Sequence, residues 1–176
     1  MAEPVPLKLT LHASCVALGD EGVLILGASG SGKSDLVLAL IDQPGYGTGD
    51  QLIRGRLVAD DQTLIERRGD ALFATSPIPI AGLMEIRGQG VVAIGHVAEA
   101  RLSLVVRLMP AAGIERMPEE KDRFTSIAGV SLNQIHVDPG QATAPARIRA
   151  ALTAPLHQEV RHIKPARSRS PQNGSF

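Results

Sequence analysis

Aromatic residues and net charge are both nearly absent from this chain of 176 residues. Aromatic side chains make up 2% of it, with no tryptophan, and 18 Lys and Arg balance 18 Asp and Glu, so the formal net charge is zero. Proteins that bind single-stranded nucleic acids stack bases on aromatic side chains, and nucleic-acid-binding domains carry a basic field. The composition therefore argues against nucleic acid as a partner.

Cysteine and long apolar runs are scarce as well. Cys15 is the single cysteine, so no disulfide can form within the chain, and a reducing compartment is the simple inference. No run approaches the ~20 apolar residues of a membrane-spanning helix. Residues 1–6 hold an acid and two prolines instead of the apolar core of a secretory signal or membrane anchor. We expect a cytoplasmic protein with no membrane partner.

The overall composition is typical of a globular protein. Its apolar fraction is 44% and its charged fraction is 20%, and the length corresponds to one domain. We expect the folded domain to cover residues 1–155. Residues 156–176 are rich in Ser, Pro and Arg and are predicted to be a disordered tail, with a phosphate-contacting tail as the less favoured alternative.

The strongest motif is a glycine-rich loop after an apolar strand. Residues 23–26 (Val-Leu-Ile-Leu) lead into residues 27–34, which fit the P-loop pattern of a glycine, four residues and then Gly-Lys-Ser. Glycines let successive N–H groups turn inward around a phosphate, and the positive end of the next helix favours the same anion. The lysine can reach terminal phosphates and the serine hydroxyl can ligate magnesium. The predicted nucleotide-binding residues are Gly27, Ala28, Ser29, Gly30, Ser31, Gly32, Lys33 and Ser34.

A glycine-rich turn that binds nothing is the alternative to this interpretation. It is disfavoured because the loop, the lysine, the serine and both flanking elements agree. The i,i+4 pairs Leu36/Leu40 and Val37/Ile41 predict a helix that begins at Lys33.

The remaining pattern predicts an α/β fold. Alternating residues across a turn at 19–22 indicate a β-hairpin that leads into the loop, which is not the usual entry to a simple doubly wound fold. Residues 102–108 are the best candidate for a central strand, and residues 111–123 are predicted to be an exposed loop. The other predicted elements are strands at 7–11, 57–59 and 130–137, a hairpin of 63–67 with 71–75, and helices at 33–42 and 143–152 capped by Thr143.

Acidic residues after the strand at 57–59 are candidates for chemistry. P-loop proteins often place there the acid that holds magnesium or orients a nucleophile. Asp60 and Asp61 point to opposite sides in extended backbone, so at most one should face the phosphate. A solvated turn is the alternative. His12 becomes relevant if its strand neighbours the loop, because an imidazole can orient an acid and share its proton.

Glu85 and Arg87 precede a Gly-x-Gly at residues 88–90. A carboxylate oxygen can bind magnesium and a guanidinium can bind phosphate. The alternative is an ordinary surface turn, which is the more common structure of such a segment. The other histidines show no metal-ligand spacing, and we interpret them as structural or exposed: His96, His136, His157 and His162.

Taken together, these motifs resemble the HPr kinase/phosphorylases of bacteria, over about residues 11–152. Residues 12–14 (His-Ala-Ser) are similar to that family's Val-His-Gly segment. Residues 57–61 (Leu-Val-Ala-Asp-Asp) and 84–90 (Met-Glu-Ile-Arg-Gly-Gln-Gly) resemble its Leu-Val-Ala-Asp-Asp and Leu-Glu-Ile-Arg-Gly-Leu-Gly motifs. The resemblance implies a kinase that uses ATP and Mg²⁺ to phosphorylate a serine of the phosphocarrier protein HPr. It also implies a P-loop core related to phosphoenolpyruvate carboxykinases, with an added β-hairpin subdomain and a homo-oligomeric, typically hexameric, assembly.

The resemblance also implies roles for single residues. Asp60 matches the acid that takes the serine proton, and His12 matches the histidine paired with that acid. Lys33 matches the phosphate-binding lysine, and Ser34 and Glu85 match the magnesium ligands. The family's catalytic arginine lies in an Asp-Arg-Leu-Gly-like segment, which residues 115–118 (Glu-Arg-Met-Pro) match best. Arg116 is therefore the first candidate and Arg123 the second.

Two departures from the family pattern qualify what the resemblance implies. His12 lies almost at the start, so the chain resembles the short alphaproteobacterial type without the long N-terminal domain. Residues 137–142 (Val-Asp-Pro-Gly-Gln-Ala) replace Val-Arg-Pro-Gly-Arg-Asn, a segment tied to dephosphorylation and HPr contact. We therefore expect a kinase with weak or absent phosphorylase activity. The alternatives are a small-molecule P-loop kinase and a nucleotide-binding regulatory module without turnover.

Overall fold

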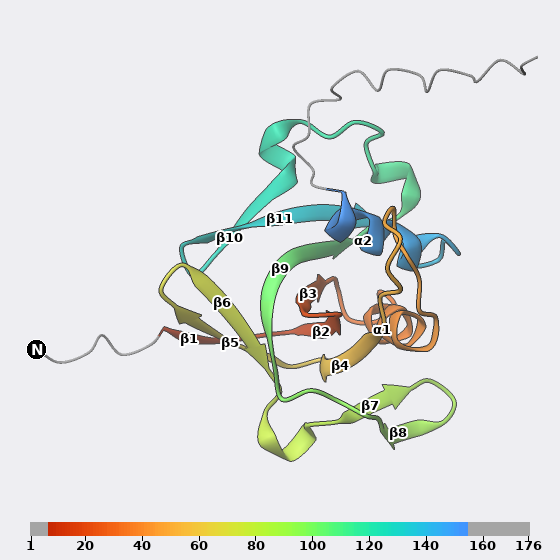
Figure 1. Ribbon diagram of the computed structural model, residues 1–176. Helices are drawn as coiled ribbons and strands as arrows, with labels where there is room; N and C mark the ends of the chain where they lie inside the picture. Colours follow the sequence, from red (N-terminus) through yellow and green to blue (C-terminus); the bar gives the residue numbers. More distant parts are fainter. Residues whose placement is uncertain (1–6, 155–176) are drawn as a thin grey trace, which may run out of the picture.

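The computed structural model of the chain describes residues 7–154, and most of its strands form one curled, nine-stranded mixed sheet (Figure 1). The strand order is β1-β5-β6-β9-β3-β2-β4, with β11 also paired to β9 and β10 paired to β11. The strands of this sheet are β1 (Lys8–Leu11), β2 (Ala13–Leu18), β3 (Glu21–Leu26), β4 (Gly55–Ala59), β5 (Thr63–Arg68), β6 (Ala71–Thr75), β9 (Glu99–Leu108), β10 (Phe124–Ile127) and β11 (Val130–Val137).

Two helices and one separate hairpin complete the fold. The helices are α1 (Lys33–Asp42) and α2 (Ala144–Thr153), and the hairpin consists of β7 (Leu83–Ile86) and β8 (Gly90–Ala93). Three short 3₁₀ turns lie at Ile78–Ile80, Ala111–Gly113 and Glu120–Arg123. No helix within residues 7–154 is long and apolar enough to cross a membrane.

Strand β9 connects the two parts of the sheet. Its first residues pair with β6, and its remaining residues lie between β3 and β11 (Figure 1). Strands β3, β9 and β11 run parallel, so their carboxyl ends meet at one edge of the sheet. In open α/β sheets this edge is where ligands bind, because the loops that follow the strands converge there.

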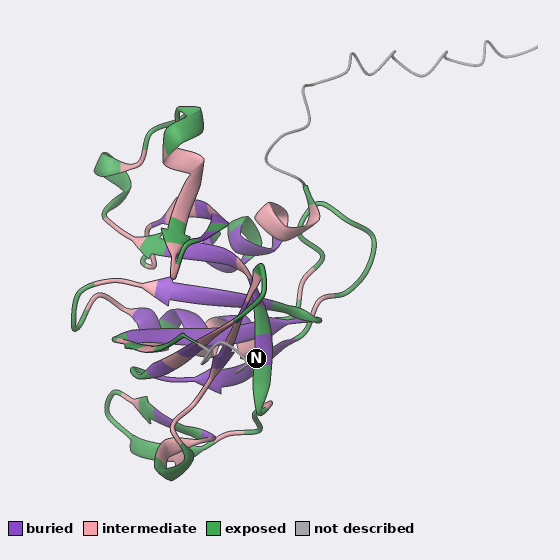
Figure 2. Cartoon of the chain, turned by 90° about the vertical axis from the view of Figure 1, so that its left-hand side faces the viewer, coloured by how far each residue is buried: buried purple, intermediate pink, exposed green. Residues whose placement is uncertain are grey.

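The core has two clusters, one on each face of β3 and β9. Leu24 and Val105 belong to the cluster inside the curl of the sheet, whereas Ile25 and Val106 pack with α1 and α2. Because both faces are covered, β3 and β9 need apolar residues in succession and not in alternation. Figure 2 shows these buried strands at the centre, with the β7–β8 hairpin largely exposed.

Most of the predicted elements are confirmed. The helix at 33–42, the hairpin before the glycine-rich loop, the hairpin of β5 with β6 and the strand at 130–137 are all present. Strand β9 begins three residues earlier than predicted, at Glu99. Thr143 occupies the N-cap position of α2, but its side chain makes no capping hydrogen bond, so that detail was wrong. The predicted tail at 156–176 lies outside the described residues.

Strand β10 is absent from the prediction. It pairs with β11 through a two-residue turn at Ala128 and Gly129, both of which have positive φ (49° and 77°). Hairpin turns of this kind are usually marked by Asn-Gly or Asp-Gly. An alanine in the left-handed region carries no such signal, and four residues are too few to show a period.

Arg149 of α2 is a buried cation that joins three segments. Its side chain is 2% exposed, and it donates hydrogen bonds to the carbonyl oxygens of Leu40 (2.8 Å), Ile53 (3.2 Å) and Pro145 (3.4 Å). Leu40 lies in the last turn of α1, where carbonyl groups lack helical partners and the helix end favours positive charge. Burial lowers the pKa of the Arg149 guanidinium from its ordinary value.

We expect Arg149→Met to lower the free energy of unfolding by about 2 kcal/mol or more, because it leaves buried carbonyls without their charged donor. Arg147→Met is the matched control, since Arg147 is exposed on the same helix. It should change stability by less than about 0.5 kcal/mol. Urea unfolding followed by far-UV circular dichroism measures both, as the chain has no tryptophan. Equal losses in the two variants would contradict a stabilising role of the buried guanidinium.

Candidate functional site

The glycine-rich loop connects β3 to α1, as predicted. Gly32 is the N-cap of α1 and has a φ of 92°, which L side chains rarely adopt. A side chain at Gly27 would collide with the Ser31 hydroxyl and would lie 3.1 Å from the Leu108 Cβ. The Ser31 Oγ is buried and has no hydrogen-bond partner among the described residues. A narrow cradle with an unsatisfied hydroxyl at a helix N-terminus suits a phosphate.

Lys33, the first residue of α1, has a buried ammonium group. Its side chain is 5% exposed, and Nζ donates to the carbonyl oxygens of Gly27 (3.1 Å) and Ala28 (3.0 Å). The Nε2 atom of His12 lies 3.3 Å from the same Nζ. Partial charges of carbonyls offset a buried cation only in part, so an anion on the loop is electrostatically favoured.

Asp60 is the acid that points into the site. It follows β4, is 7% exposed, and accepts hydrogen bonds from the hydroxyls of Ser14 (2.8 Å) and Ser34 (2.9 and 3.1 Å to its two oxygens). The backbone N–H of Glu85 donates to it at 3.4 Å. A register shift between β2 and β4 at Cys15/Val16 lies next to Ser14. Sequence reasoning missed Ser14, because nothing in a run of apolar and small residues marks it.

Asp61 has a different environment from its neighbour Asp60. Its backbone is left-handed (φ 62°) and its side chain is 66% exposed. Its Oδ1 lies 3.2 Å from Nδ1 of His12. The imidazole of His12 lies against Asp61 on one side and Lys33 on the other, so the predicted pairing of His12 with Asp60 has no support from these contacts. Asp60 alone is buried, but the cause is a turn at Asp61 and not alternation along a strand.

One pocket of about 300 Å³ collects most of the predicted residues. Glu85 of β7 and Arg87, which follows that strand, reach it from the hairpin, opposite the glycine-rich loop. Asp35 in the first turn of α1 also lines it and was not predicted. The lining consists of Ser29, Gly30, Gly32, Lys33, Ser34, Asp35, Asp60, Asp61, Glu85 and Arg87.

The oxygen atoms in this pocket suit magnesium bound together with phosphate. Ser34, Asp60 and Glu85 supply a hydroxyl and two carboxylates from three different elements. Within residues 7–154 no group of three or more His, Cys, Asp and Glu side chains is arranged to hold a metal ion by itself. Mg²⁺ commonly takes only one or two protein carboxylates and completes its shell with phosphate oxygens and water. The donor set therefore fits a metal that arrives with its phosphate ligand.

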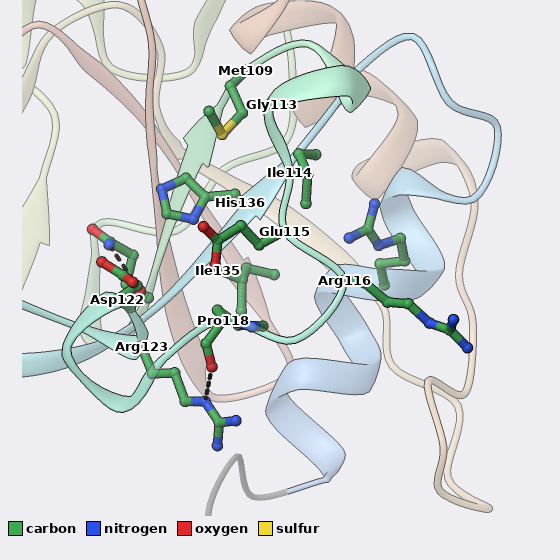
Figure 3. A pocket seen from close by; sticks show the side chains of 12 residues that line it. Met109, Gly113, Ile114, Glu115, Arg116, Pro118, Asp122, Arg123, Ile135 and His136 are labelled. Carbon is green, nitrogen blue, oxygen red and sulfur yellow. Dashed lines mark hydrogen bonds between the residues drawn. The ribbon is translucent and has the colours of Figure 1, made fainter.

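The two candidate arginines do not join this pocket. Arg116 and Arg123 line a second pocket, and Figure 3 shows the Arg116 side chain pointing away from Met109 and His136. Arg123 donates from Nε to the carbonyl oxygen of Pro118 at 3.1 Å (Figure 3). The structure thus brings together Lys33, Ser34, Asp60 and Glu85, with His12 in contact with Lys33, but not Arg116.

Comparisons with known proteins agree on one family. The family model described as HPr Serine kinase C-terminal domain matches residues 6–167. The HPr kinase/phosphorylase of Chlorobium phaeobacteroides (strain BS1) is 35% identical over 144 residues, which are 74% of this chain and 39% of that protein. The HPr kinase/phosphorylase of Limosilactobacillus reuteri (strain DSM 20016) is 30% identical over 148 residues, 78% of this chain and 43% of the relative. The chain thus spans about two-fifths of the length of the curated relatives it matches.

A solved structure resembles most of this chain. The HPr(Ser) kinase/phosphatase from Coxiella burnetii superposes with a TM-score of 0.66 at 25% sequence identity. The match covers 82% of this chain and 88% of that chain. The mixed α/β fold with its curled sheet is therefore shared with a protein of that name.

Proposed function

The chain belongs to the HPr serine kinase C-terminal domain family, and we propose that it transfers the γ-phosphoryl group of ATP to a serine of an HPr-like phosphocarrier protein. The observation that carries this proposal is the convergence of Lys33, Ser34, Asp60 and Glu85 on one pocket beside a glycine-rich loop. Phosphoryl transfer requires a loop that binds the phosphates, a cation, a base for the acceptor proton and ligands for a metal ion. The names of the curated relatives support the same reaction class.

The proposed fold assignment is a P-loop NTPase-like core related to phosphoenolpyruvate carboxykinases, with added antiparallel hairpins. The parallel strands β3, β9 and β11, with the glycine-rich loop between β3 and α1, support it. We further propose that residues 1–155 form the catalytic domain and that the protein acts in the cytoplasm as a homo-oligomer, with a hexamer as the family-like assembly.

In the proposed reaction Asp60 is the general base. The serine oxygen of the acceptor forms a bond to the γ-phosphorus, the bond from that phosphorus to the β,γ-bridging oxygen breaks, and ADP leaves. The serine proton passes to the Asp60 carboxylate, which the hydroxyl of Ser14 and the N–H of Glu85 hold in one orientation. A bound magnesium ion supplies positive charge beside the phosphates, and Ser34 and Glu85 would hold it.

His12 acts in this proposal through Lys33. The Asp61 carboxylate lies 3.2 Å from Nδ1 of the imidazole, which favours a proton on that nitrogen and leaves Nε2 to face the lysine ammonium at 3.3 Å. The ammonium is thereby held over the loop, where it neutralises charge on the transferring phosphoryl group. On this geometry we regard His12 as a positioning residue. The catalytic role predicted for Arg116 has no support from its place in the fold.

Mass spectrometry of a candidate HPr after incubation with the protein, ATP and Mg²⁺ tests the function. We expect one added phosphoryl group on a serine.

Lys33→Ala should abolish the transfer, because it removes positive charge worth several kcal/mol in the transition state. The variant should keep the native circular dichroism spectrum. Lys8→Ala, an exposed lysine of β1, is the matched control and should keep the wild-type rate. Consumption of ATP with a metabolite but with no HPr would favour a small-molecule kinase, and binding without transfer would favour a regulatory module.

Asp60→Asn and Asp61→Asn separate the two neighbouring acids. Asp60→Asn keeps the shape but removes the proton acceptor, so kcat should fall by about 10²-fold or more. Asparagine tolerates positive φ, so Asp61→Asn should preserve the turn and weaken only the contact with His12. We expect a loss of about tenfold or less from Asp61→Asn, as it removes no reacting group. A larger loss in Asp61→Asn than in Asp60→Asn would reverse the assignment.

The reverse reaction should be weak. Phosphorolysis brings inorganic phosphate and phosphoserine into one site, where arginines are the natural countercharge. Asp138 lies at a position where the family pattern has an arginine. Its carboxylate accepts hydrogen bonds from the N–H groups of Ala111 and Gly140, both at 2.9 Å, so it stabilises the neighbouring loops and does not attract an anion. Pyrophosphate release from serine-phosphorylated HPr and millimolar phosphate should be much slower than the forward reaction, and Gln141→Arg should increase it. Equal forward and reverse rates in the wild type would show that the arginines are dispensable.

A further inference from the structure

A second pocket, of about 480 Å³, opens beyond the carboxyl ends of β9 and β11 (Figure 3). Its walls come from the segment after β9, from β11, from the turn at Glu120–Arg123 and from α2. Met109, Ile114 and Ile135 line it together with the imidazole of His136. None of these residues belongs to the pocket of Lys33 and Asp60. The volume falls within the range of sites that hold small organic molecules, about 300–1,000 Å³.

This pocket shares a wall with the glycine-rich loop. A side chain at Gly27 would begin 3.1 Å from the Cβ of Leu108, and the next residue, Met109, lines the pocket. Pro139, just beyond β11, lies 3.3 Å from the place where a side chain at Gly32 would begin. The N–H of Met109 donates to the carbonyl oxygen of Val137 at 3.1 Å, so the ends of β9 and β11 form one continuous wall. A ligand seated on the loop can therefore extend over this wall without leaving the sheet edge.

The chemistry of the lining suits a flat, uncharged ring better than an anion. Its apolar side chains come from Met109, Ile114 and Ile135, and its three arginines are accompanied by the carboxylates of Glu115 and Asp122. A site that binds a polyanion without a metal ion carries a clear excess of cations, and this lining has three arginines against two carboxylates. An apolar pocket with a few polar groups that can accept or donate at a ring edge is typical of a nucleobase site.

The position of the acids gives the direction of the nucleotide. Asp60 and Glu85 approach the loop from β4 and β7, on the far side of β3 and β2 from β9 and β11. The acceptor serine must reach Asp60, so it occupies that side. The part of the nucleotide remote from the γ-phosphate must then lead the opposite way, towards β9 and β11.

We propose that this second pocket binds the base and ribose of the nucleoside triphosphate whose phosphates lie on residues 27–32. The assignment rests on the proposed function, because it presupposes a nucleotide on that loop. Ile114 and His136 contact the faces of the base, and Glu115 accepts hydrogen bonds at its edge. Arg147 of α2 also lines the pocket and donates to the amide oxygen of Gln141 at 3.2 Å. Arg116 then belongs to the nucleoside side of the site and not to the phosphoryl group.

Calorimetric titration of the full chain with MgATP and with magnesium tripolyphosphate, which lacks base and ribose, tests the proposal. We expect Ile114→Glu and His136→Ala to raise the Kd for MgATP by about tenfold or more, which corresponds to about 1.4 kcal/mol. The Kd for tripolyphosphate should not change. Met117→Ala is the matched control, since Met117 lies in the same segment, is 80% exposed and does not line the pocket. It should leave both Kd values unchanged, whereas Lys33→Ala should weaken both ligands.

Photocrosslinking with 8-azido-ATP gives a second measurement that needs no variant. Labelled peptides should come from residues 109–116 or 134–136, and labelling confined elsewhere would overturn the proposal even if Ile114→Glu failed to fold. Unchanged MgATP binding in both variants, or equal weakening of MgATP and tripolyphosphate, would also overturn it while the kinase assignment stands. A wild-type protein that bound neither ligand would overturn both.

Discussion

The buried carboxylate of Asp60 is the constraint on which the arrangement of this site depends. A buried charge is costly unless hydrogen bonds replace the water that it loses. Ser14 of β2, Ser34 of α1 and the N–H of Glu85 in β7 supply those bonds. One side chain at the end of β4 thereby connects the sheet, the first helix and the separate hairpin. The hairpin shares no ladder with the main sheet, so this contact and the burial of Met84 among residues of α1 and β4 hold it in place.

The glycine-rich loop divides the sheet edge into two chemically different sides. On the side of β4 and β7 the groups are carboxylates and hydroxyls, which suit proton transfer and magnesium. On the side of β9 and β11 they are apolar side chains with arginines and acids in near balance, which suit an organic ring. The parallel course of β3, β9 and β11 places both sides at one edge. A phosphate chain on the loop would therefore have its reactive end and its organic end in different surroundings.

Residues that depart from the family pattern have structural partners here. Asp138 stands where the family has an arginine, and its two carboxylate oxygens hold the backbone at Ala111 and Gly140. An arginine cannot accept such bonds, so the change from arginine to aspartate alters both the charge and the way in which the loops after β9 and β11 are connected. Arg149 connects α1, α2 and Ile53, two residues before β4, in a comparable manner, through carbonyl groups alone.

The sequence by itself determined the elements whose signals are local. The glycine-rich loop, the helix at 33–42, the hairpin of β5 with β6 and the central strand β9 follow from glycine geometry and from apolar periods within single segments. The grouping of Ser34, Asp60 and Glu85 was inferred from a family resemblance, and the structure brings these residues together.

Only the tertiary structure decided which residues meet across long separations in the chain. The partner of His12 is Asp61 and not Asp60, because the backbone turns to positive φ directly after β4. Ser14 reaches Asp60 beside a register shift between β2 and β4, and β10 exists through a turn in which an alanine adopts positive φ. Such contacts depend on strand register and on single backbone angles, and neither leaves a periodic trace in the sequence. For the same reason Arg116 could be matched to a motif but not placed, since its segment is irregular and its position follows from the strands β9 and β11 that flank it.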